Sequence, residues 1–212
     1  MKNKALTEAT WILGALAAGW LLTLALLPVA SILFAAAILF TLYFFRDPER
    51  VPPAGEHLAV SPADGVVTTI DEVDEDEFLK KRVQRIGIFL SVLDVHVNRS
   101  PIAGEVTHSE PKPGLFLDAR DPRCSILNQS RSWVIAGPSG TVMVKQITGA
   151  IARRICPWAV VGDTLDRGAR FGMIRFGSRT ELYLPLDAKI LVKNGDRVRG
   201  GETILAELPQ IP

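Results

Sequence analysis

One segment near the N-terminus constrains the fold of this chain more than any other feature. From Trp11 to Phe45 no side chain carries a charge. A single helix of that length would be far longer than the roughly 20 residues that cross a bilayer core. Pro28 divides the segment into two apolar stretches, residues 11–27 and 29–45, and a proline removes a helix hydrogen bond. The sequence therefore predicts a helical hairpin that turns near Pro28, either tightly or as a re-entrant segment.

The charges around this hairpin predict its orientation. Lys2 and Lys4 precede it, and Arg46 and Arg50 follow it, as expected when both ends stay on the cytoplasmic side of a membrane. A cleaved signal peptide is the alternative, but the apolar segment is too long for one and no small-residue cleavage site follows it. We therefore expect residues 1–45 to anchor the chain in the cell membrane, with the rest on the cytoplasmic side.

The rest of the chain, residues 46–212, is long enough for one domain with its own core. Its apolar residues fall into short β-prone runs separated by Gly, Pro and Asp, and long helical periodicity is scarce. Residues 71–77 hold six acids in seven positions, and we predict a solvated turn or short helix there. The β-prone runs are residues 65–70, 85–93, 133–136, 142–147, 180–184 and 190–192.

Two turn sequences indicate the kind of β fold. Residues 162–168 and 195–201 share a frame that begins Gly-Asp, has an apolar fourth residue and ends in glycine. Each frame places turn residues between β-prone runs, so we expect one turn architecture used twice. Such turns resemble those of biotinyl and lipoyl carrier domains and of the wider barrel-sandwich folds. The expected fold class is mainly β, a barrel-sandwich-like catalytic domain behind an α-helical membrane hairpin.

Charge and cysteine content argue against two classes of protein. The 24 basic and 23 acidic residues nearly cancel, which disfavours a nucleic-acid partner held by bulk charge. Cys124 and Cys156 lie 32 residues apart and the three histidines are scattered, so neither a metal site nor a disulfide framework is expected.

Three short segments carry candidate catalytic residues. Asp64 lies in a Pro/Gly turn before a predicted strand, where it could also bond its own backbone. His96 closes an apolar strand, and histidine suits general acid–base work near neutral pH, although a structural role is as common. Gly177 and Ser178 lie between strand-like runs, and the residues around them do not fit the G-x-S-x-G elbow of hydrolases.

Taken together, these segments resemble the phosphatidylserine decarboxylase family, and most closely its short bacterial and archaeal form. The resemblance runs in order from about Phe44 to the C-terminus. Proteins of this family are made as self-processing proenzymes. The segments that carry the resemblance are residues 45–50 (FRDPER), 62–65 (PADG), 94–99 (DVHVNR), 146–155, with QI at its start and ARRI at its end, and 176–178 (FGS) within 170–185.

The resemblance implies that the chain cuts itself between Gly177 and Ser178 without hydrolysis. The Ser178 hydroxyl attacks the Gly177 carbonyl to give an ester, and β-elimination then turns residue 178 into a pyruvoyl group, the covalent cofactor. Cleavage leaves a β chain of residues 1–177 and an α chain of residues 178–212. These two chains form a heterodimer, because their strands are expected to share one core.

The resemblance also implies roles for His96 and Asp64. The imidazole activates Ser178 as a base, and the aspartate orients or charges it, as in a catalytic triad. The longer bacterial and eukaryotic forms carry a second histidine three positions after the first, where this chain has Arg99. Either His96 serves both self-cleavage and turnover, or another group takes one of these roles.

The implied mature reaction converts phosphatidylserine to phosphatidylethanolamine and CO2 in phospholipid biosynthesis, a carboxy-lyase activity. The pyruvoyl ketone forms a Schiff base with the amine of the serine headgroup and accepts the electrons released with CO2, and His96 returns the proton. Another serine-headgroup lipid, such as archaetidylserine, fits the same chemistry. Cations such as Arg153, Arg154, Lys80 and Lys81 could hold the domain against anionic lipid, or each could be an ordinary solvated cation.

Two further interpretations remain open. The Gly-Asp turns also fit a membrane-tethered carrier, but no lysine lies between two methionines and Lys189 is the nearest imitation of a carrier lysine. An inactive relative is the other alternative, against which the presence of Ser178, His96 and Asp64 argues.

Overall fold

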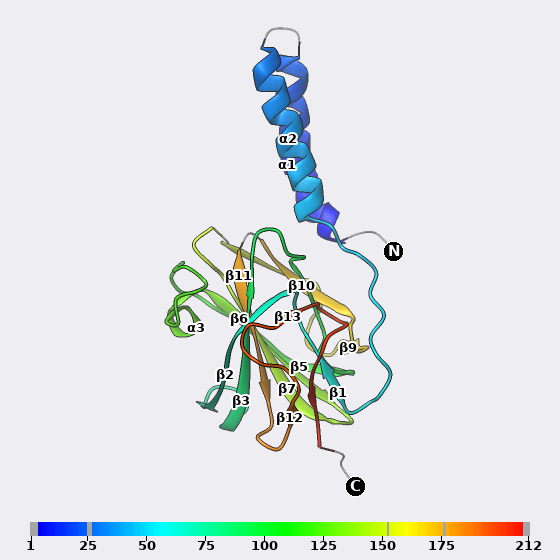
Figure 1. The fold of residues 1–212 in the computed structure, drawn as a ribbon, viewed down its shortest axis with the longest axis vertical. Helices are drawn as coiled ribbons and strands as arrows, with labels where there is room; N and C mark the ends of the chain where they lie inside the picture. The colour runs from blue at the N-terminus through cyan, green and yellow to red at the C-terminus, as the bar shows by residue number, and fades with distance from the viewer. Residues whose placement is uncertain (1–3, 25–26, 152, 176, 210–212) are drawn as a thin grey trace. The chain divides into compact units, whose positions relative to one another are not determined.

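The computed structural model of the chain describes residues 4–24, 27–151, 153–175 and 177–209. The chain divides into two compact units, Met1–Glu49 and Arg50–Pro212 (Figure 1). Each unit is described by itself below.

The first unit is a pair of helices, α1 (Lys4–Thr23) and α2 (Pro28–Phe44). The predicted break is confirmed: α2 begins at Pro28, where the missing N–H of proline is not needed. A side chain at Gly19 would meet the ring of Phe34, so glycine lets the helices approach closely. The 20 residues of α1 are long and apolar enough to cross a membrane, and both helices expose large apolar side chains. Such an outward-facing apolar surface fits a lipid environment.

The second unit is mainly β, which confirms the predicted fold class. A curled eight-stranded antiparallel sheet has the order β13-β2-β3-β11-β7-β6-β5-β9, and two three-stranded sheets have the orders β1-β14-β12 and β4-β10-β8. The elements are β1 (Leu58–Val60), β2 (Gly65–Glu75), β3 (Lys81–Leu90), β4 (Val97–Arg99), β5 (Gly104–Lys112), α3 (Cys124–Leu127), β6 (Ser130–Gly137), β7 (Gly140–Ile147), β8 (Arg154–Pro157), β9 (Thr164–Leu165), β10 (Arg170–Arg175), β11 (Ser178–Leu184), β12 (Lys189–Ile190), β13 (Arg197–Val198) and β14 (Ile204–Glu207).

The acidic run differs from its prediction. Its first five residues, 71–75, continue β2 and pair with β3 instead of forming a turn. The reason is cross-strand charge pairing, because Asp71 bonds Arg85 at 2.6 Å and Glu72 bonds Arg82 at 3.1 Å. Asp71 lies directly across the ladder from Arg85, and Glu72 reaches Arg82 diagonally. Such opposite-charge pairs favour the strand over a self-repelling turn.

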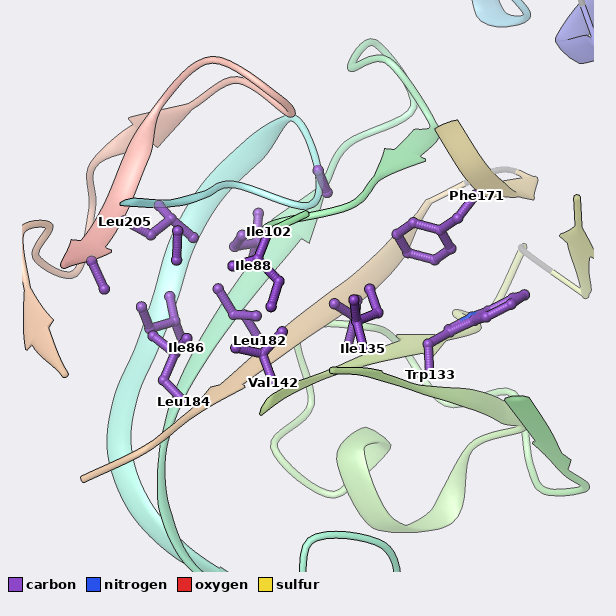
Figure 2. Packing of buried hydrophobic residues seen from close by; sticks show 14 of the residues in the cluster. Ile86, Ile88, Ile102, Trp133, Ile135, Val142, Phe171, Leu182, Leu184 and Leu205 are labelled. Carbon is purple, nitrogen blue, oxygen red and sulfur yellow. The ribbon is translucent and has the colours of Figure 1, made fainter. Parts of the chain in front are cut away.

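The core lies inside the curled sheet (Figure 2). Alternate residues of each strand point inward, so Ile86 of β3, Val142 of β7 and Leu182 of β11 meet there. The rings of Trp133 and Phe171 pack edge to face, with centroids 5.1 Å apart. Burial of each such side chain contributes about 1.5–3 kcal/mol to the stability of the domain.

The two Gly-Asp turns have one architecture, as predicted from their shared frame. Gly162 and Gly195 both adopt a φ of 93°, in the left-handed region that favours glycine. In each turn the aspartate carboxylate accepts the N–H three residues before it, at 2.9 Å, from Val160 to Asp163 and from Lys193 to Asp196.

Candidate active site

Ser178 begins β11, the strand that lies between β3 and β7. Its side chain is fully buried, and its Oγ has no hydrogen-bond partner among the described residues. A buried hydroxyl without a partner is uncommon and calls for a functional explanation. Gly177 adopts a φ of 56°, which a residue with a side chain rarely does. Phe176, which belongs to the predicted motif, lies outside the described residues, as does Ala152.

His96 lies directly beside this junction. Its Nε2 accepts the N–H of Gly177 at 3.2 Å, and its Nδ1 lies 2.9 Å from the carbonyl oxygen of Asp94. Because a carbonyl oxygen only accepts, these partners assign the ring proton to Nδ1 and leave the lone pair of Nε2 facing the junction. The structure thus brings together His96, Gly177 and Ser178.

Strand pairing explains how residues so far apart in sequence meet. β4 follows His96 and pairs with β10, with Val97 opposite Met173. The N–H of Ile174 donates to the carbonyl of His96 at 3.2 Å. β10 then ends at Arg175, two residues before Gly177, so the β4–β10 ladder sets the distance between the imidazole and the junction.

The backbone carbonyl of Asp94 positions the His96 ring, and the side chain of Asp94 fixes the backbone there. Its Oδ2 accepts the N–H and the Oγ–H of Ser91, at 2.8 and 2.7 Å, and its Oδ1 accepts Nη2 of Arg197 at 2.8 Å. These bonds close the turn after β3. Sequence reasoning placed Asp94 inside the motif but missed this role, because nothing in the spacing says which aspartate braces the histidine.

The Asp64 side chain is mostly buried between two groups from distant parts of the unit. Its carboxylate accepts Nη2 of Arg50 at 3.0 Å and the N–H of Gly200 at 2.7 Å. Arg50 also bonds Glu202 at 2.7 Å. Burial raises the pKa of Asp64 above 3.8, although the Gly200 N–H and Arg50 oppose the rise. The action of Asp64 on His96 stays a prediction.

A buried chain of neutral polar groups continues from the site into the core. Asn98 donates to Thr180 Oγ1 at 3.3 Å and accepts Nε2 of Gln146 at 2.6 Å. Trp133 Nε1 donates to the other end of Gln146 at 2.8 Å. The chain ties β4, β7, β6 and β11 together, so fully satisfied amides fix the strands that carry the reacting residues.

Arg99 takes the place of the second histidine of the longer family forms. Its side chain is buried, and its Nη1 donates to the carbonyl of Gly168 at 3.1 Å. The guanidinium therefore bonds the end of the first Gly-Asp turn. An arginine side chain stays protonated in proteins and cannot accept a proton as a base.

Gly149 was not found by sequence reasoning, since a lone glycine after a strand carries no signal. A Cβ built on Gly149 would lie 2.4 Å from the carbonyl oxygen of Gly177. The same Cβ would lie 3.3 Å from Cβ of Ala119. The backbone of Gly149 thus lies against the carbonyl of the junction, in a space that no side chain could share.

The opposite face of β11 carries a charged cluster. The buried Glu181 carboxylate accepts Nε of Arg179 and the hydroxyl of Tyr183, both at 2.7 Å, and also the hydroxyl of Ser125. Burial acts to raise the pKa of Glu181, but Arg179 and Arg85 together with these hydrogen bonds hold it below 4.5.

The guanidinium of Arg179 is fully engaged on the other side as well. Its two terminal nitrogens donate to the hydroxyls of Thr68 and Thr69, each at 3.0 Å. A bulge in β2 between Val67 and Thr69 presents these neighbouring threonines together. Gly87 leaves room for the guanidinium, because a Cβ there would overlap its terminal nitrogen.

Lys189, the nearest imitation of a carrier lysine, lies in β12. Its Nζ pairs with Glu207 at 3.1 Å across the β12–β14 ladder. This position is the ordinary environment of a strand lysine at a protein surface.

The fold and the site define a β-rich domain, preceded by an apolar hairpin, with a buried Gly-Ser junction facing an imidazole. The chain matches the model of the phosphatidylserine decarboxylase family over residues 37–206. A Symbiobacterium thermophilum protein named phosphatidylserine decarboxylase proenzyme is 46% identical over 212 residues, 99% of each chain. Proteins of the same name from Pelobacter propionicus and Gluconacetobacter diazotrophicus are 47% and 51% identical, covering 94% and 80% of this chain and 90% and 77% of their own. This chain therefore belongs to the phosphatidylserine decarboxylase family, which confirms the resemblance found in its motifs.

Proposed function

We propose that this chain is made as a proenzyme, cuts itself between Gly177 and Ser178, and decarboxylates phosphatidylserine to phosphatidylethanolamine and CO2. One observation carries the proposal. In a chain of this family, the buried hydroxyl of Ser178, which has no partner in the described part of the chain, follows a glycine whose N–H bonds His96 Nε2 at 3.2 Å.

Self-cleavage begins with the Ser178 hydroxyl. His96 Nε2 takes its proton, Oγ attacks the carbonyl carbon of Gly177, and the amide C–N bond breaks as the nitrogen of residue 178 takes up the proton. The product is an ester. Gly177 suits this step because it has no side chain beside the carbonyl and tolerates the observed φ of 56°.

Elimination then separates the two chains. A base removes the Cα proton of residue 178, the Cβ–Oγ bond breaks, and Gly177 leaves with a free carboxylate. The remaining dehydroalanine takes up water and loses ammonia, which leaves a ketone at the new N-terminus. The residues present fit this group, because Ser178 is the one buried side-chain hydroxyl at the junction and is uncommitted among the described residues.

In turnover the pyruvoyl group supplies an electron sink for the electron pair released with CO2. His96 holds the proton that replaces the carboxyl group on the substrate carbon. Of the two possibilities for the missing second histidine, we favour His96 in both self-cleavage and turnover. Its Nε2 faces the junction, and Arg99, which stands where the second histidine would be, cannot act as a base. Asp64 is assigned to orient or charge the imidazole because the family resemblance implies it. The two ring nitrogens of His96 contact Gly177 and Asp94, so Asp64 would act on the ring through its charge or through other groups.

The products are assigned to a β chain of residues 1–177 and an α chain of residues 178–212 that stay together as a heterodimer. The α-chain strands β11, β13 and β14 all pair with β-chain strands, namely β3 and β7, β2, and β1. The charged cluster crosses the same boundary, since Arg179 and Glu181 belong to the α chain and their partners Thr68, Thr69 and Ser125 to the β chain.

We assign residues 1–45 to a membrane anchor and residues 46–212 to the catalytic domain, on the cytoplasmic side of the cell membrane. The length and exposed apolar surface of the α1–α2 hairpin support the anchor. Basic residues at both ends of the hairpin support the orientation.

Intact mass spectrometry of the purified full chain tests the proposal. Wild type should give two fragments that break at Gly177, the smaller with a blocked N-terminus and a mass consistent with pyruvoyl, and should convert phosphatidylserine vesicles to phosphatidylethanolamine. Ser178→Ala should stay full length and inactive. Ser100→Ala, which removes another fully buried serine hydroxyl, should be cut normally. A folded wild type of full-length mass would overturn self-cleavage.

A further inference from the structure

Two loops next to the Gly177–Ser178 junction expose large apolar side chains. One is the segment around α3 and the other follows β7 (Figure 1). We call the set formed by Leu115, Phe116, Ile126, Leu127 and Ile151 the apolar rim; these side chains are 54%, 38%, 77%, 42% and 68% exposed. Large apolar side chains exposed together on neighbouring loops mark interaction sites on soluble domains.

Contacts hold the two loops together and against the junction. The guanidinium of Arg153 lies 5.5 Å from the ring centre of Phe116, which joins the loops. Gly149, at the start of the second loop, approaches both Ala119 of the first loop and the carbonyl of Gly177. The two loops that carry the apolar rim therefore meet at the junction, and from there α3 extends over the outer face of the sheet, where Ser125 bonds Glu181 and Lys145.

The charges around the apolar rim are positive. Arg153 and Arg154 are exposed beside it. The charges of the first-loop arginines are balanced locally. Arg120 bonds Asp118 at 2.6 Å, and Arg123 bonds Asp121 at 2.7 Å. The two exposed arginines of the second loop therefore set the sign of the field at this end.

The opposite end of the same strands carries acidic and basic side chains together. In β3, Leu90 lies across from Ser178, whereas Lys81 lies across from Glu75. At about 3.4 Å per residue, Lys81 is about 30 Å from the junction. The acidic run 71–77 lies at that distant end. Acids of this run pair with Arg85, Arg82 and Lys112, so acidic charge at the far end is offset by basic partners. The exposed arginines of the second loop are therefore the feature that attracts an anionic surface to the end with the junction.

We propose that the catalytic domain docks on an anionic lipid bilayer through the apolar rim, with Arg153 and Arg154 at the level of the headgroups. The end of β11 that begins at Ser178 then lies toward the membrane surface, while Lys80 and Lys81 face water. This docking acts in addition to the membrane anchoring assigned to the hairpin. Its benefit to turnover rests on the proposed function, but the contact itself does not.

Lipid contact is tested directly with a fluorescent probe on the full chain. A cysteine replaces Ile126 and is labelled with an environment-sensitive dye. The buried Cys124 and Cys156 should not react with the dye, and treating wild type with the dye measures any labelling at these two residues. The matched control carries the label at Leu186. This side chain is also exposed, at 47%, but it lies beyond the far end of β11. The protein is reconstituted in phosphatidylcholine vesicles with and without phosphatidylglycerol.

Brominated lipids should quench the dye at residue 126 and not at residue 186, and more strongly when phosphatidylglycerol is present. Equal quenching at the two positions would overturn the proposal. Ser178→Ala carrying the same labels should behave identically. That outcome separates docking from the proposed function, which fails independently if mass spectrometry shows no cleavage.

A kinetic test asks whether the contact serves catalysis. The double variant Ile126→Asp with Ile151→Asp should be cut normally and turn over phosphatidylserine in vesicles about tenfold more slowly. Its rate on a short-chain, monomeric phosphatidylserine should match that of wild type. Leu186→Asp should leave both rates unchanged. An equal loss on both substrates would show a damaged site instead of a lost membrane contact, and would contradict the proposal.

Discussion

The two faces of β11 hold polar groups of different kinds. On the face toward the core, Thr180 joins a chain of neutral amides, and the Ser178 hydroxyl has no partner among the described residues. On the other face, Arg179 and Glu181 are charged and bonded on several sides. Alternation along a strand separates these environments by a single residue.

The difference teaches how one strand can both react and stay in place. A hydroxyl left without a partner costs about 1–3 kcal/mol, but it remains free to attack the neighbouring carbonyl. Breaking a buried ion pair costs about 3–5 kcal/mol, so the charged face resists loss of the strand after the chain is cut. Ser178 on the neutral face reacts, and the charged face keeps β11 attached to the sheet.

The largest expected effect falls on the reacting face. His96→Gln removes the base whose Nε2 faces the junction, so self-cleavage should slow by about 10²–10⁴-fold, followed as the loss of full-length chain by mass spectrometry. His108→Gln, at an exposed histidine of β5, should be cut at the wild-type rate. Normal cleavage of the His96 variant would remove His96 from the self-cleavage step.

The charged face should respond in stability instead of chemistry. Glu181→Gln leaves Arg179 buried without its counter-charge, so the free energy of unfolding should fall by about 3–5 kcal/mol. The measurement is urea unfolding in detergent, in a Ser178→Ala background that keeps one chain. Glu72→Gln, at an exposed pair with Arg82, should change it by less than about 1 kcal/mol. Similar losses in both variants would contradict a special role for the cluster.

Gly149 offers a steric test of the reacting face. Gly149→Ala places a methyl group 2.4 Å from the Gly177 carbonyl oxygen, and the forced shift should slow self-cleavage about hundredfold. Gly104→Ala creates the same 2.4 Å clash with the Ala136 carbonyl, remote from the junction, and should destabilise without slowing cleavage. If both variants lose cleavage in proportion to stability, Gly149 has only a structural role.

The smallest effect is a dependence of stability on acid pH. The folded-state pKa of Glu181 lies below 4.5, so its contribution is fully present above that value and is lost as the pH falls through the folded pKa. Asp64, whose folded-state pKa is raised above 3.8, acts with the opposite sign, because its protonation favours the folded state. Unfolding of Ser178→Ala across the acid range should therefore flatten when Glu181→Gln is added; an unchanged slope would contradict this account.

Much of the fold could be predicted from local patterns. The uncharged segment with Pro28 indicated the hairpin, and the repeated Gly-Asp frames indicated two identical turns, which the structure confirms. These predictions succeed because length, charge and left-handed glycine conformations are local properties. The acidic run was misassigned because its strand is stabilised by Arg82 and Arg85 across the ladder, which no window on one strand contains.

The sequence alone determined the anchor-like hairpin, the β class of the body and the order of motifs that places Ser178, His96 and Asp64 in one family pattern. Only the tertiary structure decided which groups touch them: the Asp94 carbonyl on the imidazole, Arg50 on Asp64, and the Gly149 backbone against the junction. The physical reason is that these contacts join strands distant in sequence. Their geometry depends on ladder register and close packing, which the order of residues along the chain does not state.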